Sequence, residues 1–212
     1  MSTAYLKRTY LSKKKEITSR MDDFEKVKEL GENSLLGELA FCISTANSSA
    51  KAAYRAQTEL LKTGLIYSDN SEHIAEVLLK SKVRFHNNKA KYIVAARKQL
   101  FVNGEFEKYV NESKDEFELR DSLAESVMGF GMKEAAHFLR NTGYGKQTAI
   151  LDRHILRNLK RYGAIEEIPK SLTPNKYREI EGKMLEFSKE MKIPPAHLDL
   201  VFWSEETGEI FK

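Results

Sequence analysis

Proline is confined to the last quarter of this 212-residue chain, at Pro169, Pro174, Pro194 and Pro195. Residues 1–168 contain none. Proline breaks the interior of a helix, so a long proline-free stretch with apolar residues at helical spacing favours helices. No sustained alternation of apolar and polar residues marks a strand. The sequence therefore predicts an all-α fold.

Apolar periodicity, together with glycine and polar residues at helix ends, defines the expected helices. They cover residues 11–30, 35–45, 50–61, 74–79, 89–100, 105–110, 118–127, 133–141, 177–191 and 196–203. A further helix begins at Asp152, and Gly143 is expected to close the helix over 133–141 as a C-terminal cap.

The chain has a net charge of +4, with 41% hydrophobic and 31% charged residues. This balance is typical of a soluble globular protein, and its sign is compatible with a polyanionic partner. The apolar runs are too short to span a bilayer, and the N-terminus has no apolar signal core, so we expect a cytoplasmic protein. Basic residues gather in two clusters, although solvated helix faces have the same pattern. The clusters are Lys80, Lys82, Arg84, Lys89, Lys91, Arg97 and Lys98, and Arg153, Arg157, Lys160 and Arg161.

Cys42 is the only cysteine in the chain. A single thiol cannot form an internal disulfide, and it cannot supply the four thiolates that hold an iron–sulfur cluster. The histidines His73, His86 and His197 show no metal-ligand spacing.

Residues 127–136 join the end of one expected helix to the start of the next through two glycines two positions apart. Gly129 and Gly131 allow a tight turn, and Phe130 between them can pack back between the two helices. The amides of such a turn and of a helix N-terminus can approach a phosphate closely without reading base sequence. The segment indicates either a helix-hairpin-helix that grips a DNA backbone or a plain turn between helices.

Lys133 lies in the first turn of the second of these helices. Most lysines are solvated surface amines. A helix N-terminus, however, disfavours an ammonium, and an uncharged amine is the form that attacks a sugar carbon and makes a Schiff base. Lys133 is therefore a candidate nucleophile.

Asp152 follows an apolar run and precedes a helix, which makes it an N-cap by its position alone. Capping also keeps the carboxylate ionised. An ionised carboxylate near a sugar can stabilise the cationic transition state of glycosidic cleavage, so capping and catalysis are compatible at Asp152.

Residues 129–133, with Asp152 downstream, resemble the helix-hairpin-helix DNA glycosylase superfamily. The longer stretches 131–144 and 149–156 are similar to the archaeal-type 8-oxoguanine DNA glycosylase/AP lyase family. Residues 42–49, 84–85 and 198–203 also resemble this family, so the similarity extends from about Leu35 to the end of the chain.

The resemblance implies a bifunctional DNA repair enzyme that needs no cofactor and has no iron–sulfur cluster. Lys133 would attack the deoxyribose C1′ and displace the oxidised guanine, and the resulting Schiff base would allow β-elimination, which nicks the strand. Asp152 would assist proton movement and stabilise the developing positive charge. The implied partner is double-stranded DNA containing 8-oxoguanine, bound by a monomer at the nucleoid.

The resemblance also implies which residues contact the DNA and the damaged base. Asn47 would help fill the gap left by the everted nucleotide, and Arg84 and Phe85 would lie near the widowed cytosine. Trp203 would stack on the extruded base, and the terminal carboxylate of Lys212 would help to recognise it.

In the hairpin, the resemblance implies that Gly129 and Gly131 contact DNA, and that a Na⁺ or K⁺ ion binds nearby. The ion would be held by the backbone carbonyls of Glu125, Val127 and Phe130. Two helical lobes are expected, with an active-site cleft between them. One lobe combines residues 1–45 and 150–212; the other covers 46–149 and contains the helix-hairpin-helix at about 118–141.

Other interpretations remain open at this point. The chain could be a non-catalytic helix-hairpin-helix DNA-binding module or a glycosylase for a different lesion. An iron–sulfur relative is disfavoured by the single cysteine, and an adenine-excising relative by Lys133. Trp203 and Phe85 could instead be core residues, and Asn47 a helix C-cap.

Overall fold

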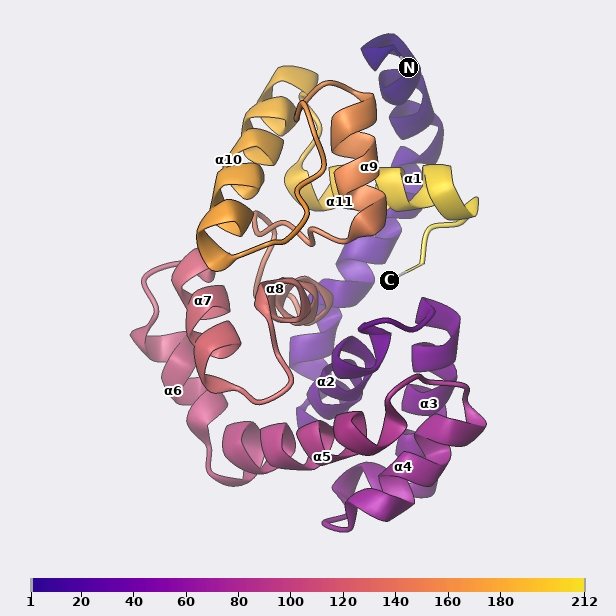
Figure 1. The fold of residues 1–212 in the computed structure, drawn as a ribbon, viewed down its shortest axis with the longest axis vertical. Coiled ribbons are helices and arrows are strands. Elements are labelled where there is room, and N and C mark those ends of the chain that lie inside the picture. The colour runs from indigo at the N-terminus through magenta and orange to yellow at the C-terminus, as the bar shows by residue number, and fades with distance from the viewer. Residues whose placement is uncertain (1, 212) are drawn as a thin grey trace.

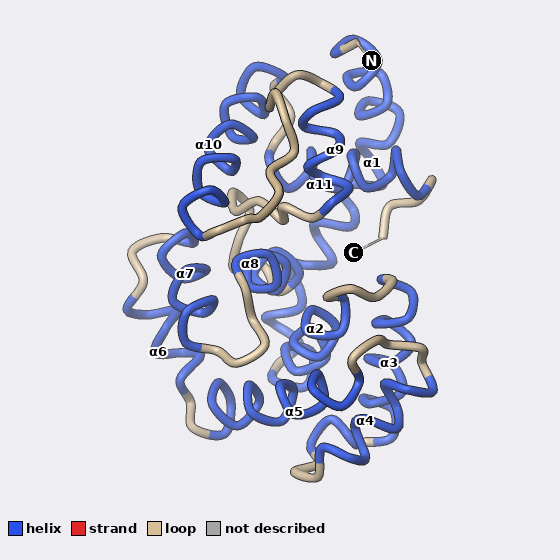
Figure 2. The backbone as a smooth tube through the Cα atoms, viewed as in Figure 1, coloured by secondary structure: helices blue, strands red, loops and turns tan. Residues whose placement is uncertain are grey.

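The computed structural model describes residues 2–211, and every regular element in that range is helical (Figure 1). Figure 2 shows these helices joined by loops, of which the segments from α8 to α9 and from α9 to α10 are long. They are α1 (Thr3–Val27), α2 (Glu32–Thr45), α3 (Ala50–Thr63), α4 (Ser71–Lys80), α5 (His86–Arg97), α6 (Glu105–Glu112), α7 (Glu116–Ser126), α8 (Met132–Asn141), α9 (Arg153–Arg161), α10 (Pro174–Met191) and α11 (Pro195–Thr207). A π-helical turn, Lys98–Val102, extends α5, and 3-10 turns lie at Lys28–Leu30 and Leu65–Tyr67. The predicted all-α fold is confirmed.

Helix α1 begins at Thr3, well before the expected start near Leu11. Ser2 caps it, because the Ser2 hydroxyl accepts a hydrogen bond from the amide of Tyr5 at 3.3 Å. Leu6 is fully buried, so the first turns of α1 pack against the protein as well as its later ones.

The buried apolar side chains form two clusters, which we call the central lobe and the terminal lobe. The central lobe draws on α2 to α8, and the terminal lobe on α1 and on the segment from residue 149 to α11. In Figure 1 the terminal lobe occupies the upper part of the view and the central lobe the lower part. Two helical lobes are therefore present, and the first and last helices, α1 and α11, both lie in the terminal lobe.

The expected lobe boundary at residue 45 is wrong for α2. Its residues from Leu35 to Ser44 are all buried, and its apolar side chains belong to the central lobe. A helix that is apolar all round is covered by neighbours on every side, and α2 packs against α3, α5 and α8. The boundary between the lobes therefore precedes α2 instead of following it.

Helix α8 lies at the junction of the lobes and contacts α1, α2 and α7 (Figure 1). Two buried ion pairs cross this junction. The Arg120 guanidinium on α7 binds both carboxylate oxygens of Glu181 on α10, each at 2.9 Å. Arg140 on α8 pairs with Asp199 on α11. Buried charges are stable only when they are paired in this way, so the pairs fix the lobes relative to each other.

Among residues 2–211, no helix combines the length and the apolar character needed to cross a membrane.

Candidate active site

The connection between α7 and α8 is the expected hairpin. Gly129 has φ +92°, and a Cβ atom there would lie 2.7 Å from the Cβ of Tyr92 on α5. Only glycine fits, because both the conformation and the close approach exclude a side chain. Phe130 is buried and packs against Phe138 of α8, with ring centroids 5.6 Å apart. The hairpin therefore packs against two helices, α5 through Gly129 and α8 through Phe130.

Two hairpin amides already have partners within the protein. The Phe130 amide donates to the carbonyl of Val127 at 3.1 Å, and the Gly131 amide donates to Oε2 of Glu134 at 3.3 Å. Gly131 itself has extended backbone and precedes the first residue of α8. The first amides of a helix have no intrahelical partner, so those at the start of α8 are the donors left for a phosphate.

Lys133 lies in the first turn of α8, and 22% of its side chain is exposed. Its Nζ is 3.0 Å from Oε1 of Glu134 and 3.5 Å from the hydroxyl of Thr45 on α2. Neither Glu134 nor Thr45 was predicted as a partner of Lys133.

Asp152 is the N-cap of α9, as its position predicted. Its Oδ1 accepts hydrogen bonds from the amides of His154 and Ile155, at 2.7 and 2.9 Å. Both bonds fix the orientation of the carboxylate at the helix N-terminus. Among the described residues, the ion pair of Lys133 is with Glu134 and not with Asp152.

The carboxylate of Asp152 lies beside the ion pair that joins α8 to α11. Burial raises the pKa of Asp199 to about 6, and the negative charge of Asp152 adds to this shift, whereas Arg140 opposes it. Asp152 is therefore close enough to influence the junction of the lobes from the terminal side, while Lys133 belongs to a helix on the central side.

Asn47, Arg84 and Phe85 lie together on one exposed surface. The amide of Arg84 donates to the hydroxyl of Ser48 at 2.9 Å, which joins the two loops. The Arg84 guanidinium lies over the Phe85 ring, 5.5 Å from its centroid. Phe85 is 57% exposed, and Asn47 is exposed as well, so neither is a core residue.

Trp203 on α11 is partly buried and meets His154 of α9 edge-on, with ring centroids 5.1 Å apart. Its indole Nε1 is buried and finds no hydrogen-bond partner within residues 2–211. Buried indole N–H groups normally have an acceptor, so Trp203 is an exception to that rule. Lys212 lies outside the described residues. The carbonyl of its neighbour Phe211 accepts from Nε of Arg20 at 2.6 Å.

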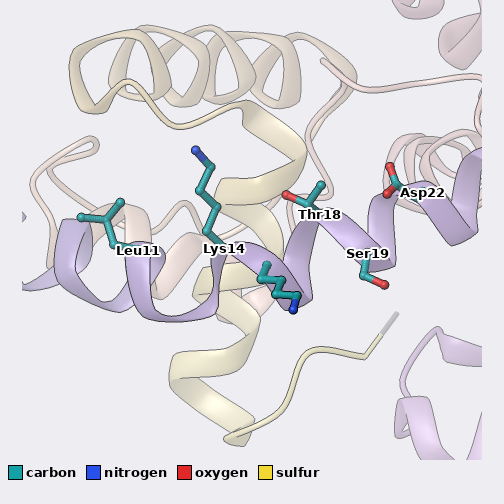
Figure 3. A pocket seen from close by; sticks show the side chains of 6 residues that line it. Leu11, Lys14, Thr18, Ser19 and Asp22 are labelled. Carbon is teal, nitrogen blue, oxygen red and sulfur yellow. The ribbon is translucent and has the colours of Figure 1, made fainter.

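Surface hollows elsewhere do not coincide with these residues. One hollow, of about 550 Å³, follows α1 and is lined by Leu11, Lys14, Lys15, Thr18, Ser19 and Asp22 (Figure 3). Figure 3 shows that these side chains are spread along a single helix and do not converge. A second hollow, of about 840 Å³, lies between α3 and α4. Neither contains Lys133 or Asp152.

Lys89 is a residue whose surroundings the sequence did not reveal. It belongs to a basic cluster that resembles a solvated face, yet it is only 4% exposed. The positive charge of Lys133 contributes to lowering its pKa, so the two amines are neighbours.

Comparison with known proteins identifies the family of this chain. The family model described as 8-oxoguanine DNA glycosylase matches residues 17–193. A protein of Fusobacterium nucleatum named 8-oxoguanine DNA glycosylase/AP lyase is 41% identical over 210 residues, which cover 98% of this chain and 96% of that one.

Solved structures lead to the same family. The 8-oxoguanine DNA glycosylase of Thermotoga maritima has a TM-score of 0.88 and 34% identity, covering 99% of this chain and 98% of that one. The Methanocaldococcus jannaschii 8-oxoguanine glycosylase/lyase in complex with a 15mer DNA containing 8-oxoguanine has a TM-score of 0.86 and 35% identity, covering 98% and 100%. This chain therefore belongs to the 8-oxoguanine DNA glycosylase family.

Proposed function

We propose that this chain excises 8-oxoguanine from duplex DNA by cleaving its N-glycosidic bond and then nicks the strand by β-elimination. The observation that carries the proposal is the pair Lys133 and Asp152, each at the start of a helix on opposite sides of the lobe junction. Sequence relatives of this chain from Fusobacterium nucleatum and Methanocaldococcus jannaschii are named 8-oxoguanine DNA glycosylase/AP lyase.

In this mechanism Lys133 is the nucleophile. Its amine must lose a proton before its lone pair can attack the deoxyribose C1′. Oε1 of Glu134, 3.0 Å away, is within reach to accept that proton. Attack then breaks the bond between C1′ and N9, and the departing base takes up a proton. Ring opening gives an iminium that acidifies the C2′ protons, and loss of one of them expels the 3′ phosphate, which nicks the strand.

Asp152 acts by charge in the same mechanism. Its Oδ1 is held by two amides of α9, so the carboxylate does not have to reorganise as positive charge grows on the sugar. Trp203, which is only partly buried, would stack its ring face on the extruded base.

DNA is held by charge and by the hairpin. Basic side chains and the first amides of α8 would bind phosphates, so the affinity should fall steeply with salt. A Na⁺ or K⁺ ion between the hairpin and a phosphate is part of the proposal. Glu125 is in the last turn of α7, where carbonyls lack helical donors, and the Val127 carbonyl keeps one lone pair after accepting from Phe130. These oxygens fit such an ion, which would supply positive charge toward the DNA.

The monomeric state, the nucleoid location and recognition of the base by the terminal carboxylate of Lys212 remain part of this proposal. The net charge of +4 supports DNA binding without defining where in the cell it occurs.

Borohydride trapping tests the proposal. Wild-type protein should form a covalent adduct with a duplex containing 8-oxoguanine and nick it, and should do neither with undamaged duplex. Lys133→Gln should bind the lesion duplex but give no adduct and no nick. Lys114→Gln is a matched control, because Lys114 is an exposed lysine near the start of α7. Wild-type protein that binds DNA but traps no lesion would support the non-catalytic module, and trapping with another lesion alone would support a different substrate.

A further inference from the structure

Lys89 is buried with all of its hydrogen-bonding capacity in use. Its Nζ donates to the carbonyls of Ser44 and Ala46, at 2.8 and 2.5 Å, and lies 3.1 Å from the hydroxyl of Ser48. An ammonium has three N–H donors, so the three contacts account for all of them.

The three acceptors surround Asn47. The amide of Ser48 donates to the carbonyl of Thr45 at 3.0 Å, and between them Ala46 has φ −54° and ψ 118° while Asn47 has φ +54°. This is a turn of type II, in which the third residue takes a left-handed conformation that asparagine tolerates. The turn follows the last residue of α2, where helical carbonyls lack donors, and Lys89 supplies the missing donors.

The Lys89 side chain also reaches the start of α5 through Ser48. The Ser48 hydroxyl, which receives the ammonium, also receives the amide of Arg84 at 2.9 Å, next to Phe85. The amide of Lys89 donates to the carbonyl of Phe85 at 3.1 Å, which is the first backbone bond of α5. Phe85 has φ +58°, a conformation that a bulky side chain rarely adopts and that persists only where its surroundings enforce it. Lys89 is thus bonded to both left-handed turns, one carrying Asn47 and the other Phe85.

Burying a charged lysine at this position lowers the stability of the fold. Burial, together with the positive charges of Lys133 and Arg84, lowers the pKa of Lys89 to about 8, and the negative charge of Glu134 opposes this shift. None of its three acceptors is an anion. A methionine of similar length would avoid this cost but would leave the turn carbonyls unpaired.

We propose that Lys89 is a positioning residue for base eversion, which fastens the Thr45–Ser48 turn to the start of α5 so that Asn47 and Phe85 enter the DNA as one rigid unit. The inference rests on the proposed function, because it assumes that Asn47 fills the gap left by the everted nucleotide and that Phe85 acts as a wedge near the widowed cytosine. It adds a residue that touches neither DNA nor the reacting atoms.

The test separates eversion from chemistry. Lys89→Met should reduce excision of 8-oxoguanine from duplex DNA, measured in single turnover at saturating protein, by about 10- to 100-fold, because misplaced groups cost rate on this scale. Cleavage of a preformed abasic site in single-stranded DNA, which needs no eversion, should stay within about twofold of wild type. The fluorescence rise of a 2-aminopurine beside the lesion should slow in parallel with excision.

Two further variants support the experiment. Lys114→Met removes an exposed charge that lies outside both basic clusters, and it should leave the saturated excision rate unchanged. Ser48→Ala removes the shared acceptor with little effect on folding, and should slow duplex excision several-fold without slowing abasic-site cleavage.

The outcomes separate the two proposals. If wild-type protein fails to excise 8-oxoguanine, the proposed function fails before Lys89 is tested. If wild-type protein excises it and Lys89→Met does so equally fast, the positioning role is wrong. Equal losses of duplex excision and abasic-site cleavage in both Lys89→Met and Ser48→Ala would also overturn it, because a general structural defect has that signature.

Discussion

Lys133 and Lys89 are lysines in the same region of the protein, but their surroundings differ sharply. Lys89 is 4% exposed, and three oxygens of the turn after α2 hold its ammonium. The side chain of Lys133 is 22% exposed and contacts one carboxylate and, at 3.5 Å, one hydroxyl. A nucleophile must be able to leave its partners, whereas a positioning group must not. The contrast teaches that surroundings, not residue type or proximity to the reaction, separate the two roles.

The strongest challenge to this contrast is to remove Lys133 and raise the pH. Lys133→Gln should lose borohydride trapping by a factor on the order of 10⁴ or more, as expected for a nucleophile. At pH 9 Lys89 is largely uncharged, because its pKa is about 8, but its bonds should still keep it from the sugar. If Lys133→Gln forms an adduct at pH 9 and the double variant Lys133→Gln/Lys89→Met does not, then Lys89 itself reaches the sugar. That result would contradict the contrast between the two lysines.

Asp152 extends the contrast from amines to carboxylates, since it combines a structural and a chemical role in one side chain. Asparagine caps a helix about as well as aspartate, so Asp152→Asn should leave the free energy of unfolding within about 0.5 kcal/mol of wild type. Excision should nevertheless fall by about 10²- to 10³-fold in single turnover, because the charge is lost. Asp152→Ala should additionally lose about 1 kcal/mol on urea unfolding. If Asp152→Asn excises the base at the wild-type rate, Asp152 has only its structural role as a helix cap.

A pH series of stability sharpens the comparison on the Lys89 side. The folded-state pKa of Lys89 is about 8, below the ordinary value of 10.5, so the unfolded chain binds more protons between these values. The cost of burying the ammonium is therefore fully present below pH 8 and is relieved as the pH rises toward 10.5. Relative to Lys89→Met, wild-type protein should gain up to about 1.4 kcal/mol per pH unit in this window. Urea unfolding at pH 7.5, 8.5 and 9.5 measures the difference in the free energy of unfolding between wild type and Lys89→Met. This difference should shift in favour of wild type as the pH rises, and a constant difference would contradict the prediction.

The smallest expected effect concerns the partner of Lys133. Glu134→Gln keeps an acceptor for the Gly131 amide but removes the carboxylate beside the amine. A partly exposed ion pair contributes little, so the free energy of unfolding should change by less than about 1 kcal/mol. A loss of several kcal/mol in thermal or urea unfolding would mean that Lys133 is held as firmly as Lys89.

Most of the fold follows from local patterns. The proline-free body and the apolar spacing predicted the helices, and the Gly143 backbone after α8 is left-handed, with φ +74°, as its predicted capping position requires. The early start of α1 was missed because the capping hydroxyl of Ser2 lies among polar residues without a strong apolar period. The lobe of α2 was missed because contacts between distant helices decide it.

The candidate site divides in the same way. The N-cap at Asp152 and the hairpin at Gly129 are local, and the sequence predicted both. The burial of Lys89 is not local, since its acceptors lie 41 to 45 residues earlier in the chain. A lysine within a basic cluster gives no sign of such partners, and the partner of Lys133 at the adjacent Glu134 depends on side-chain conformations that spacing does not define.

The two ion pairs across the junction, Arg120 with Glu181 and Arg140 with Asp199, have a mechanical consequence. Opening either pair would strand a charge away from water, at a cost of about 3–5 kcal/mol. A hinge between the halves of this protein would pay that cost at every turnover. We therefore expect the two lobes to stay rigid relative to each other during turnover. The DNA would bend and evert its nucleotide, while the protein keeps its conformation.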